Sequence, residues 1–219
     1  MAIPVLVIGR SGSGKTYSLK SFKANEVGVI SVEKGRLPFK SDIKTVKVPQ
    51  FKEQADASAA QINAAKYAWI EQVIQQSKSP SIVIDDSQYL LVNELFDRAA
   101  EKGYDKFTSM AANFRDLIHF VNDMEDENKI VYFLHHSEAD IDGREKVKTI
   151  GKMLDEKLTI EGCFDIVIYC QDHKFYTQSN GQSTAKTPED MFELEIPNDL
   201  KAVDDAIREY YGLKKGDKK

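Results

Sequence analysis

The sequence predicts an α/β domain in which a mainly parallel sheet is flanked by helices. Short apolar runs of β-type residues alternate with longer segments whose apolar residues recur every three or four positions. That alternation is typical of a parallel sheet with helical crossovers. The chain has 219 residues, 42% of them apolar, and no internal repeat or linker. We therefore expect one domain over residues 1–212 and a frayed Lys-rich tail over 213–219.

The first predicted strand passes into a glycine-rich loop that matches a phosphate-binding motif. Residues 3–8 are an apolar run followed by Gly-x-x-x-x-Gly-Lys-Thr, the pattern of a P-loop. Glycines let the backbone approach a phosphate, and the loop N–H groups present partial positive charge to it. Lys15 is expected to reach the β- and γ-phosphates of ATP, and Thr16 to ligate Mg²⁺. The predicted nucleotide-binding residues are Gly9, Arg10, Ser11, Gly12, Ser13, Gly14, Lys15 and Thr16.

Apolar runs and helical periodicity place the remaining elements. An edge strand is expected at 45–48, where polar and apolar residues alternate before Pro49. Buried strands are expected at 29–32, 81–86, 130–134 and 165–170, and helices after Thr16, at 56–77, at 88–100, between Gly103 and Met124, and after Asn198. The buried stripe of the helix at 56–77 is predicted to be Ile62, Ala65, Trp69 and Val73.

A hairpin is predicted near the end of the domain. Phe175 starts a β-type run that leads into Asn180-Gly181. This dipeptide favours the type I′ turn of a two-residue hairpin loop. We therefore expect a C-terminal hairpin followed by the final helix.

Composition sets limits on the class of protein. The net charge of −5 does not indicate a strongly basic surface, so any nucleic-acid-binding patch would have to be local. Cys163 and Cys170 are too few for a disulfide scaffold and are expected to be reduced thiols, as in a cytosol. No leader-like segment opens the chain, and no apolar run reaches the length of a membrane span. We therefore expect a cytoplasmic protein that does not use a membrane.

Acidic residues at strand ends complete the predicted nucleotide site. Asp85 ends a buried strand and is expected to hold Mg²⁺ together with Thr16; capping of the next helix is the structural alternative. Hydrolysis also needs a group that activates water. Glu33 follows the second strand and has the longer reach, so it is the predicted catalytic base, with Asp86 as the alternative.

Two histidines end the fourth buried strand. The alternation of a strand puts one of His135 and His136 beside the nucleotide and the other against a helix layer. We predict that His136 contacts the γ-phosphate. A zinc site is disfavoured, because no Cys or further His stands at ligand spacing.

The order of these parts resembles the RecA-like ATPases. Glu33 in Val-Glu-Lys-Gly stands where those proteins carry their catalytic glutamate, and the histidine pair stands where RecA carries a polar γ-phosphate sensor. More closely, the chain resembles small phage-encoded AAA/RecA-like ATP-binding proteins of replication and recombination modules. These include the Sak group of single-strand-annealing recombinases. Residues 85–90, 103–107 and 187–192 carry that resemblance, which covers residues 1–212.

The resemblance implies a sheet in 5-1-4-3-2 order and ATP bound between the subunits of a homo-oligomer. It also implies that a basic residue is donated to the site in trans. Lys186 is the candidate for this residue, and Lys174 is the alternative.

By the same resemblance, the charged segment at 138–158 stands where RecA-like proteins place a DNA-contacting loop. The structural alternative is a charged amphipathic helix with Ile150, Met153 and Leu154 inward, and the segment has no aromatic residue to stack on bases. The candidate phosphate contacts are Arg144, Lys146, Lys148 and Lys152.

Two function hypotheses follow. The first is a Mg²⁺-dependent ATPase that acts as an oligomer on single-stranded DNA, in phage recombination or replication within a bacterial cytoplasm. The second is a nucleotide-dependent switch or loader that binds a partner, such as a single-strand-binding protein, without contacting DNA. A small-molecule kinase is disfavoured, because no Arg-rich lid follows and the second strand ends in a lone acid.

Overall fold

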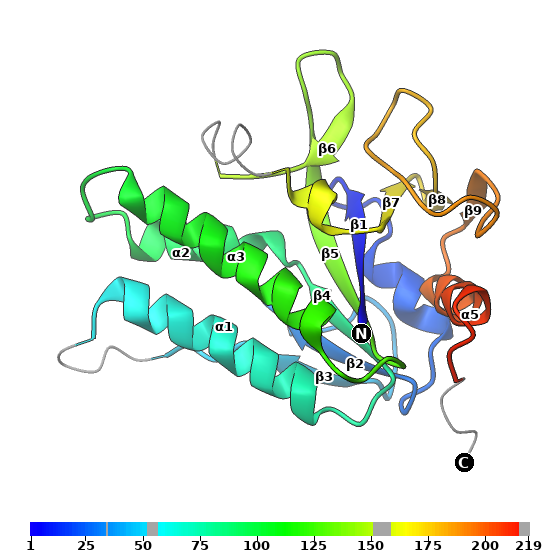
Figure 1. Ribbon diagram of the computed structural model, residues 1–219, viewed down its shortest axis with the longest axis horizontal. Helices are drawn as coiled ribbons and strands as arrows, with labels where there is room; N and C mark the ends of the chain where they lie inside the picture. The colour runs from blue at the N-terminus through cyan, green and yellow to red at the C-terminus, as the bar shows by residue number, and fades with distance from the viewer. Residues whose placement is uncertain (34, 52–56, 151–158, 215–219) are drawn as a thin grey trace.

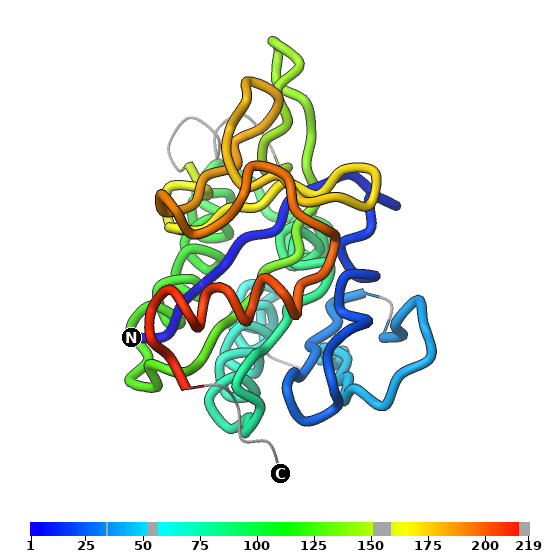
Figure 2. Tube along the Cα trace, turned by 90° about the vertical axis from the view of Figure 1, so that its right-hand side faces the viewer, coloured from blue at the N-terminus to red at the C-terminus, as the bar shows by residue number. Residues whose placement is uncertain are grey.

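The computed structural model describes residues 1–33, 35–51, 57–150 and 159–214. It confirms the predicted α/β architecture. Helices α1, α2 and α3 lie together on one side of a twisted sheet, and α5 lies on the other (Figure 1). In the view of Figure 2, α5 crosses the sheet in front of β1.

The elements have the following bounds. The strands are β1 Ile3–Gly9, β2 Val27–Ser31, β3 Lys44–Lys47, β4 Ser81–Asp85, β5 Ile130–Ala139, β6 Glu145–Val147, β7 Ile166–Gln171, β8 Lys174–Tyr176 and β9 Glu195–Pro197. The helices are the 3₁₀ helices η1 Thr16–Ser21 and η2 Ile160–Cys163, and the α-helices α1 Ala59–Gln76, α2 Gln88–Asp97, α3 Asp105–Asp123 and α5 Leu200–Tyr210. Among the described residues, none of the helices has the length and apolar character needed to cross a membrane.

The strand order of the sheet is β3-β2-β4-β5-β1-β7-β8-β9, with β6 paired to β5. Strands β7, β1, β5, β4 and β2 are parallel neighbours, so the predicted 5-1-4-3-2 order is confirmed. The predicted edge strand is also confirmed, as β3 pairs in parallel with β2. Parallel strands place their carboxyl ends at the same edge of a sheet, where ligands bind in this class of fold.

Both faces of the central strands are buried, which explains their continuous apolar sequences. In β1, Leu6 and Ile8 belong to the apolar cluster that α1 and α3 complete. Val5 and Val7 belong to the opposite cluster, which contains Leu19 of η1 and residues of α5. The period-two alternation of a strand therefore supplies side chains to two separate cores.

The predicted buried stripe of α1 is partly wrong: Trp69 and Val73 do pack, partly buried, against the core. The helix begins at a capping box between Ser58 and Gln61, but its buried residues are Asn63, Tyr67, Ile70 and Ile74, while Ala65 is exposed. Packing buries Tyr67 and leaves Ala65 exposed, because alanine offers little apolar area to bury.

The predicted turn of the C-terminal hairpin is also wrong. Strand β7 pairs antiparallel with β8, and Gln171 faces Lys174 across a two-residue loop. The loop residues Asp172 and His173 have φ of 49° and 58°, which is the positive-φ pair of a type I′ turn. The predicted Asn180-Gly181 pair lies in the long loop between β8 and β9 instead.

The charged segment after the histidine pair is not a helix in its described part. Strand β5 continues to Ala139, and β6 returns antiparallel to it, with Ser137 opposite Val147. Glu145 and Val147 are buried and Lys146 between them is half-buried, which is the period of a strand. The alternative of an amphipathic helix is therefore wrong over this part, and Met153, Leu154 and Lys152 lie outside the described residues.

Helix α5 is fixed to the sheet by a buried ion pair. The Arg208 guanidinium donates to Asp204 Oδ2 at 2.7 Å and to the Ser81 hydroxyl at 2.8 Å. Asp204 also accepts a hydrogen bond from the Tyr132 hydroxyl on β5. Burial, and the nearby Asp204 carboxylate, raise the pKa of Tyr132, so its hydroxyl remains a donor. These contacts tie α5 to β4 and β5.

Replacement of Arg208 by alanine is expected to destabilise the fold strongly. The change leaves the Asp204 carboxylate buried without its cation, a situation that costs about 3–5 kcal/mol. Chemical denaturation should measure this loss. The matched control is Arg115→Ala, whose partner Asp116 is exposed, so the loss should be below about 1 kcal/mol. Equal losses for the two variants would contradict the structural role of the Arg208 pair.

Candidate nucleotide-binding site

The glycine-rich loop connects β1 to η1 at the carboxyl edge of the sheet. Gly12 and Gly14 have φ of 80° and 110°, values that side chains rarely allow. The Lys15 ammonium donates to the carbonyls of Gly9 at 2.6 Å and Arg10 at 3.0 Å. The lysine therefore lies folded over the first residues of the loop. The helix predicted after Thr16 is the 3₁₀ helix η1.

Close packing requires glycine at two positions of the loop, Gly9 and Gly14. A Cβ on Gly9 would collide with the Cys170 carbonyl oxygen and lie 2.7 Å from the Ser13 hydroxyl oxygen. A Cβ on Gly14 would collide with the Asn198 amide and lie 2.7 Å from a ring nitrogen of His173. The loop thus has neighbours on both sides, and residues distant in sequence set its shape.

Strand β7, the β7–β8 turn and the residue after β9 support the loop through hydrogen bonds that the sequence does not predict. The His173 backbone N–H donates to the Ser13 carbonyl at 3.1 Å, and the Asn198 amide donates to the Gly14 carbonyl at 3.0 Å. The Cys170 thiol also donates to the Ser13 carbonyl, at 3.3 Å. Burial raises the pKa of Cys170 to about 11, so it remains a thiol near neutral pH.

The two predicted metal-binding residues meet. The Thr16 hydroxyl donates to Asp85 Oδ1 at 2.8 Å, and Asp85 is buried at the end of β4. Hydroxyl and carboxylate oxygens fit Mg²⁺, which keeps several waters and takes few protein ligands beside the phosphates. Within the described ranges, no group of three His, Cys, Asp or Glu side chains forms a self-sufficient metal site. The donor set therefore fits a magnesium ion shared with a nucleotide.

The histidine pair divides between the two sides of the strand. His136 Nε2 lies 3.3 Å from Asp86 Oδ1. His135 is fully buried: one ring nitrogen lies 3.0 Å from the Ser87 hydroxyl and the other 3.0 Å from the Lys148 carbonyl. Burial lowers the pKa of His135 to about 4, so it is a neutral core residue. His136 and Asp86 lie together at the carboxyl edge of the sheet.

Asp86 has an unusual backbone. Its φ is 60°, the left-handed region that aspartate tolerates better than most residues. The conformation ends β4 and lets the Asp86 carbonyl accept the Tyr89 N–H of α2 at 2.9 Å. The Asp86 carboxylate is buried beside His136.

Glu33 follows β2 at the same edge. The Val32 N–H donates to the Asp85 carbonyl at 3.1 Å, which brings the backbone before Glu33 next to the predicted metal ligand. The half-buried Glu33 lines a cavity of about 550 Å³ together with residues of α1 and α2.

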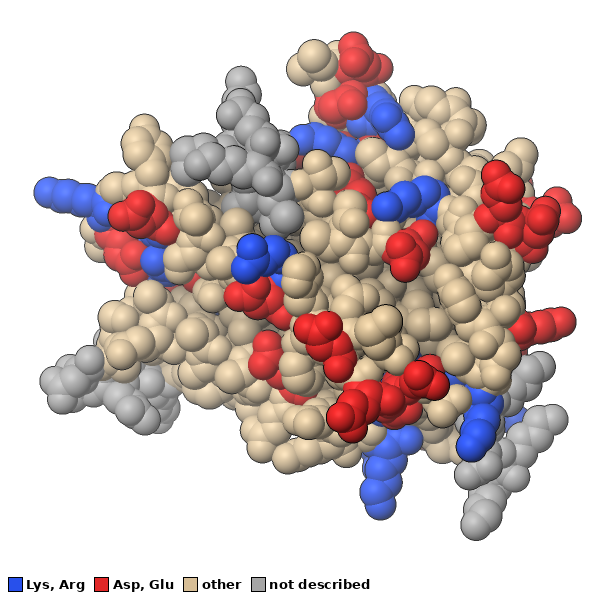
Figure 3. All heavy atoms as spheres, viewed as in Figure 1, with Lys and Arg blue, Asp and Glu red and all other residues tan. Residues whose placement is uncertain are grey.

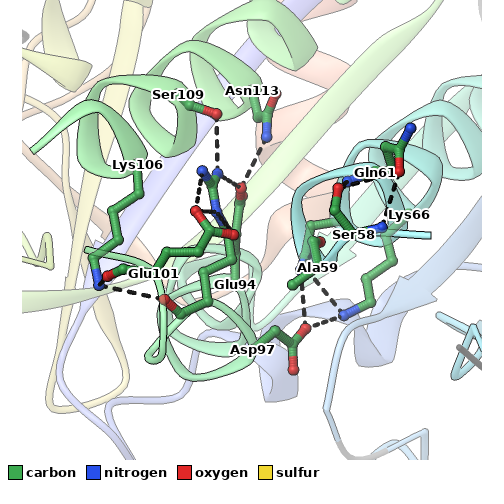
Figure 4. Close-up of polar contacts among 12 residues, drawn as sticks. Ser58, Ala59, Gln61, Lys66, Glu94, Asp97, Glu101, Lys106, Ser109 and Asn113 are labelled. Atoms are coloured by element: carbon green, nitrogen blue, oxygen red, sulfur yellow. Dashed lines mark hydrogen bonds and ion pairs between the residues drawn. The ribbon is translucent and has the colours of Figure 1, made fainter. Parts of the chain in front are cut away.

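A polar network holds the helical wall of this cavity (Figure 4). Asp97 of α2, which lines the cavity, accepts a hydrogen bond from Lys66 of α1 at 2.6 Å. On the other side of α2, the Arg98 guanidinium donates to Glu94 and to Ser109 of α3. Helices α1, α2 and α3 are therefore joined by charged hydrogen bonds beside Glu33.

An ion pair at Arg10 connects the loop to the β5–β6 hairpin. Arg10 Nε donates to Glu145 Oε1 at 2.7 Å. The Glu145 side chain is 8% exposed, whereas that of Arg10 is 66% exposed, and Ser137 donates to the second carboxylate oxygen. The buried acidic partner was not predicted, because a lone glutamate in a charged segment carries no local signal.

The predicted phosphate-binding residues of the hairpin contact other parts of the chain. Arg144 donates to the Ser183 carbonyl at 2.9 Å, and Lys146 lies 4.0 Å from Glu138. Lys148 is exposed, and its backbone bonds to both histidines of β5. Figures 1 and 2 show the hairpin beside the loop that contains Ser183. Lys152 lies outside the described residues.

The two lysines predicted to act in trans lie at strands β8 and β7 of the same chain, Lys174 as the first residue of β8 and Lys186 bridged to β7. The Lys186 backbone exchanges two hydrogen bonds with Val167 of β7. Val167 pairs with Leu6, three residues before the end of β1. Lys174 forms an exposed ion pair with Glu195 at 2.6 Å.

Comparison with known proteins identifies the family of this chain. The family model described as an AAA domain matches residues 1–192. Comparison with curated proteins gave no match. Among solved structures, the chain is similar to a prototypical ATPase from the type III secretion system of pathogenic bacteria, at 12% identity and a TM-score of 0.46. That alignment covers 76% of this chain and 50% of the other, so this chain spans about half the length of that structure. Because the family match covers most of its length, the chain belongs to the family of AAA-type P-loop ATPase domains.

Proposed function

We propose that this protein is a magnesium-dependent ATPase. The observation that carries the proposal is the hydrogen bond between the Thr16 hydroxyl and the buried Asp85 carboxylate. It joins the phosphate-binding loop to the end of β4, where hard oxygen donors hold Mg²⁺ in P-loop ATPases. When bound there, the ion neutralises charge on the β- and γ-phosphates.

The chain's own groups divide the remaining tasks. The loop N–H groups and the Lys15 ammonium bind the phosphates. Lys15 exchanges the carbonyls of Gly9 and Arg10 for phosphate oxygens. Asp85 orients the Thr16 hydroxyl. His136, whose ring lies next to Asp86, is assigned the hydrogen bond to the γ-phosphate.

Glu33 is proposed as the base that accepts a proton from the attacking water. It follows β2 at the carboxyl edge of the sheet, directly after Val32, whose N–H donates to the Asp85 carbonyl. Asp86 is the alternative base, but its carboxylate already lies 3.3 Å from His136. That contact favours a role for Asp86 in orienting His136, and leaves the base to Glu33.

The protein is proposed to act in phage DNA recombination or replication, as an oligomer on single-stranded DNA in the bacterial cytoplasm. Support comes from the resemblance of its motifs to phage-encoded recombinases. Further support comes from the hairpin that carries Arg144 and Lys146, because Glu145 of the same hairpin binds Arg10 of the loop. For the residue donated in trans, Lys186 is preferred over Lys174, whose ammonium is paired with Glu195.

A second function, that of a nucleotide-dependent switch or loader for a partner protein, is favoured by one observation. Arg144 is bound to the Ser183 carbonyl and Lys146 lies near Glu138, so both side chains contact their own chain. Acidic and basic side chains are also interspersed on the face shown in Figure 3. A partner protein tolerates such a mixed surface better than a nucleic acid does.

Asp85→Asn is expected to remove magnesium-dependent nucleotide binding. The amide cannot supply the charge that the ion requires, so the gain in ATP affinity on adding Mg²⁺ should fall by about tenfold or more, and hydrolysis with it. Titration of ATP with and without Mg²⁺ measures the effect. The control is Asp116→Asn on the exposed surface of α3, which should behave like the wild type. An unchanged magnesium effect in Asp85→Asn would contradict the proposed ATPase site.

Glu33→Gln is expected to lower kcat by about 10²–10⁴-fold while the Kd for ATP stays unchanged, since a general base acts in the reaction and not in binding. Steady-state hydrolysis and ATP titration separate the two effects. Asp86→Asn is the matched comparison and should reduce kcat less. If Asp86→Asn abolishes hydrolysis and Glu33→Gln does not, the base is Asp86.

Single-stranded DNA is expected to stimulate hydrolysis, and the double change Lys146→Ala/Lys148→Ala should reduce this stimulation, because each lost phosphate contact weakens binding. The charge-matched control is Lys23→Ala/Lys44→Ala, at exposed positions outside the hairpin. Particle size with a non-hydrolysable ATP analogue tests the oligomer. A rate of ATP hydrolysis that does not change when DNA is added would favour the switch or loader. A monomer under all conditions would exclude a lysine donated in trans.

A further inference from the structure

Three aromatic side chains from separate parts of the chain meet beside the phosphate-binding loop. They are Tyr17 of η1, Phe39 of the segment between β2 and β3, and His173 of the β7–β8 turn, and together we call them the aromatic platform. The ring centroid of Tyr17 lies 6.1 Å from that of Phe39 and 5.8 Å from that of His173. Both neighbouring rings stand nearly perpendicular to Tyr17, at 87° and 89°.

Tyr17 of the platform is accessible to solvent. It is 41% exposed, so the cluster does not bury it in a core. The Lys20 ammonium donates to the Tyr17 hydroxyl at 3.1 Å and lies 5.3 Å from the ring centroid. Ring and cation contacts therefore hold Tyr17 in one orientation while leaving much of it open to solvent.

The platform is built onto one end of the loop. Tyr17 directly follows Thr16, and the His173 N–H donates to the Ser13 carbonyl. The His173 ring lies so close to Gly14 that a Cβ there would come within 2.7 Å of Nδ1. Binding a phosphate chain in the loop would thus place whatever is attached to it near these rings.

The position of Lys15 indicates which end of a nucleotide lies there. A P-loop lysine reaches the β- and γ-phosphates, and the Lys15 ammonium lies at the carbonyls of Gly9 and Arg10. The γ-phosphate end is therefore the β1 side of the loop. The α-phosphate, ribose and base leave from the opposite side, where η1 begins.

The surface of the loop around Arg10 has a different chemistry. There Arg10 pairs with the buried Glu145, and a cavity of about 530 Å³ is lined by loop residues, Glu145, Tyr169 and Asp172. Two carboxylates at this side suit cations and water better than the face of a heterocycle. The aromatic platform offers the apolar ring surface that a base requires.

We propose that the aromatic platform binds the base of the nucleotide held by the loop, with the base stacked on Tyr17 and bordered by His173 and Phe39. The inference rests on the proposed nucleotide-binding function. A stacked base is held by its π-face, which every base has, and the larger purine overlaps more ring area. The platform therefore confers a preference for purine over pyrimidine triphosphates.

The test compares ATP with inorganic tripolyphosphate, which occupies the loop but has no base. In Tyr17→Ala the Kd for Mg-ATP should rise roughly five- to one-hundred-fold, the range of a lost stacking contact, while the Kd for tripolyphosphate stays unchanged. Tyr17→Phe keeps the ring and should bind ATP like the wild type. The preference of the wild type for ATP and GTP over CTP and UTP should shrink in Tyr17→Ala.

A second variant tests the wall of the platform without disturbing the turn. His173→Asn removes the ring but tolerates the left-handed backbone at this position, and its N–H still reaches Ser13. It should raise the Kd for ATP by less than Tyr17→Ala does, and leave the Kd for tripolyphosphate unchanged. Thermal melting of each variant checks that the fold is intact.

The outcomes separate this inference from the proposed ATPase. If Tyr17→Ala raises the Kd for ATP and for tripolyphosphate equally, or raises neither, the platform does not bind the base, whatever the rate of hydrolysis. If the wild type binds ATP but does not hydrolyse it, the ATPase proposal fails while the binding comparison still decides the role of Tyr17. If the wild type binds neither ligand, both proposals are overturned.

Discussion

The register of β1 between its two parallel neighbours is the constraint on which the site depends. Gly9 pairs with His136 of β5, and Ile8 pairs with Tyr169 of β7. On the other side of β5, β4 carries Asp85, which pairs with Ser31 at the end of β2. A slip of one residue in any of these pairings would turn alternate side chains to the opposite face. The meeting of Thr16 with Asp85 is therefore a consequence of sheet register as much as of the loop motif.

The parts that were predictable from sequence are those whose signal is local and whose partners follow from strand order. The glycine spacing gave the loop, and the apolar runs gave the sheet, so the contact between Thr16 and Asp85 could be anticipated. The errors arose where tertiary contacts chose between equivalent local patterns. In α1, packing buried Tyr67 and left Ala65 exposed. Pairing of β8 with β7 placed the hairpin turn at Asp172 and His173. Glu145 and Asn198 were missed, because only folding brings them to Arg10 and Gly14.

Buried charges in this protein connect elements that hydrophobic contact alone would leave free to slide. Asp204 and Arg208 join α5 to the sheet, and Arg98 joins α2 to α3. Glu145 does the same between the glycine-rich loop and the β5–β6 hairpin. Such pairs add little net stability compared with apolar packing, but they tolerate few alternative arrangements. One of them, the pair of Arg10 and Glu145, stands at the nucleotide edge, where a loss of register would separate the groups that act together.

The thiol of Cys170 has a consequence for reactivity. It donates a hydrogen bond to the Ser13 carbonyl beneath the loop, and burial raises its pKa to about 11. At neutral pH almost none of it is the nucleophilic thiolate, so electrophiles should react with it slowly in the closed structure. Alkylation then requires the loop to move away from β7, and its rate measures how often that happens. The alkylation rate of Cys170 thus reports how often the loop opens, and a bound triphosphate should lower that rate.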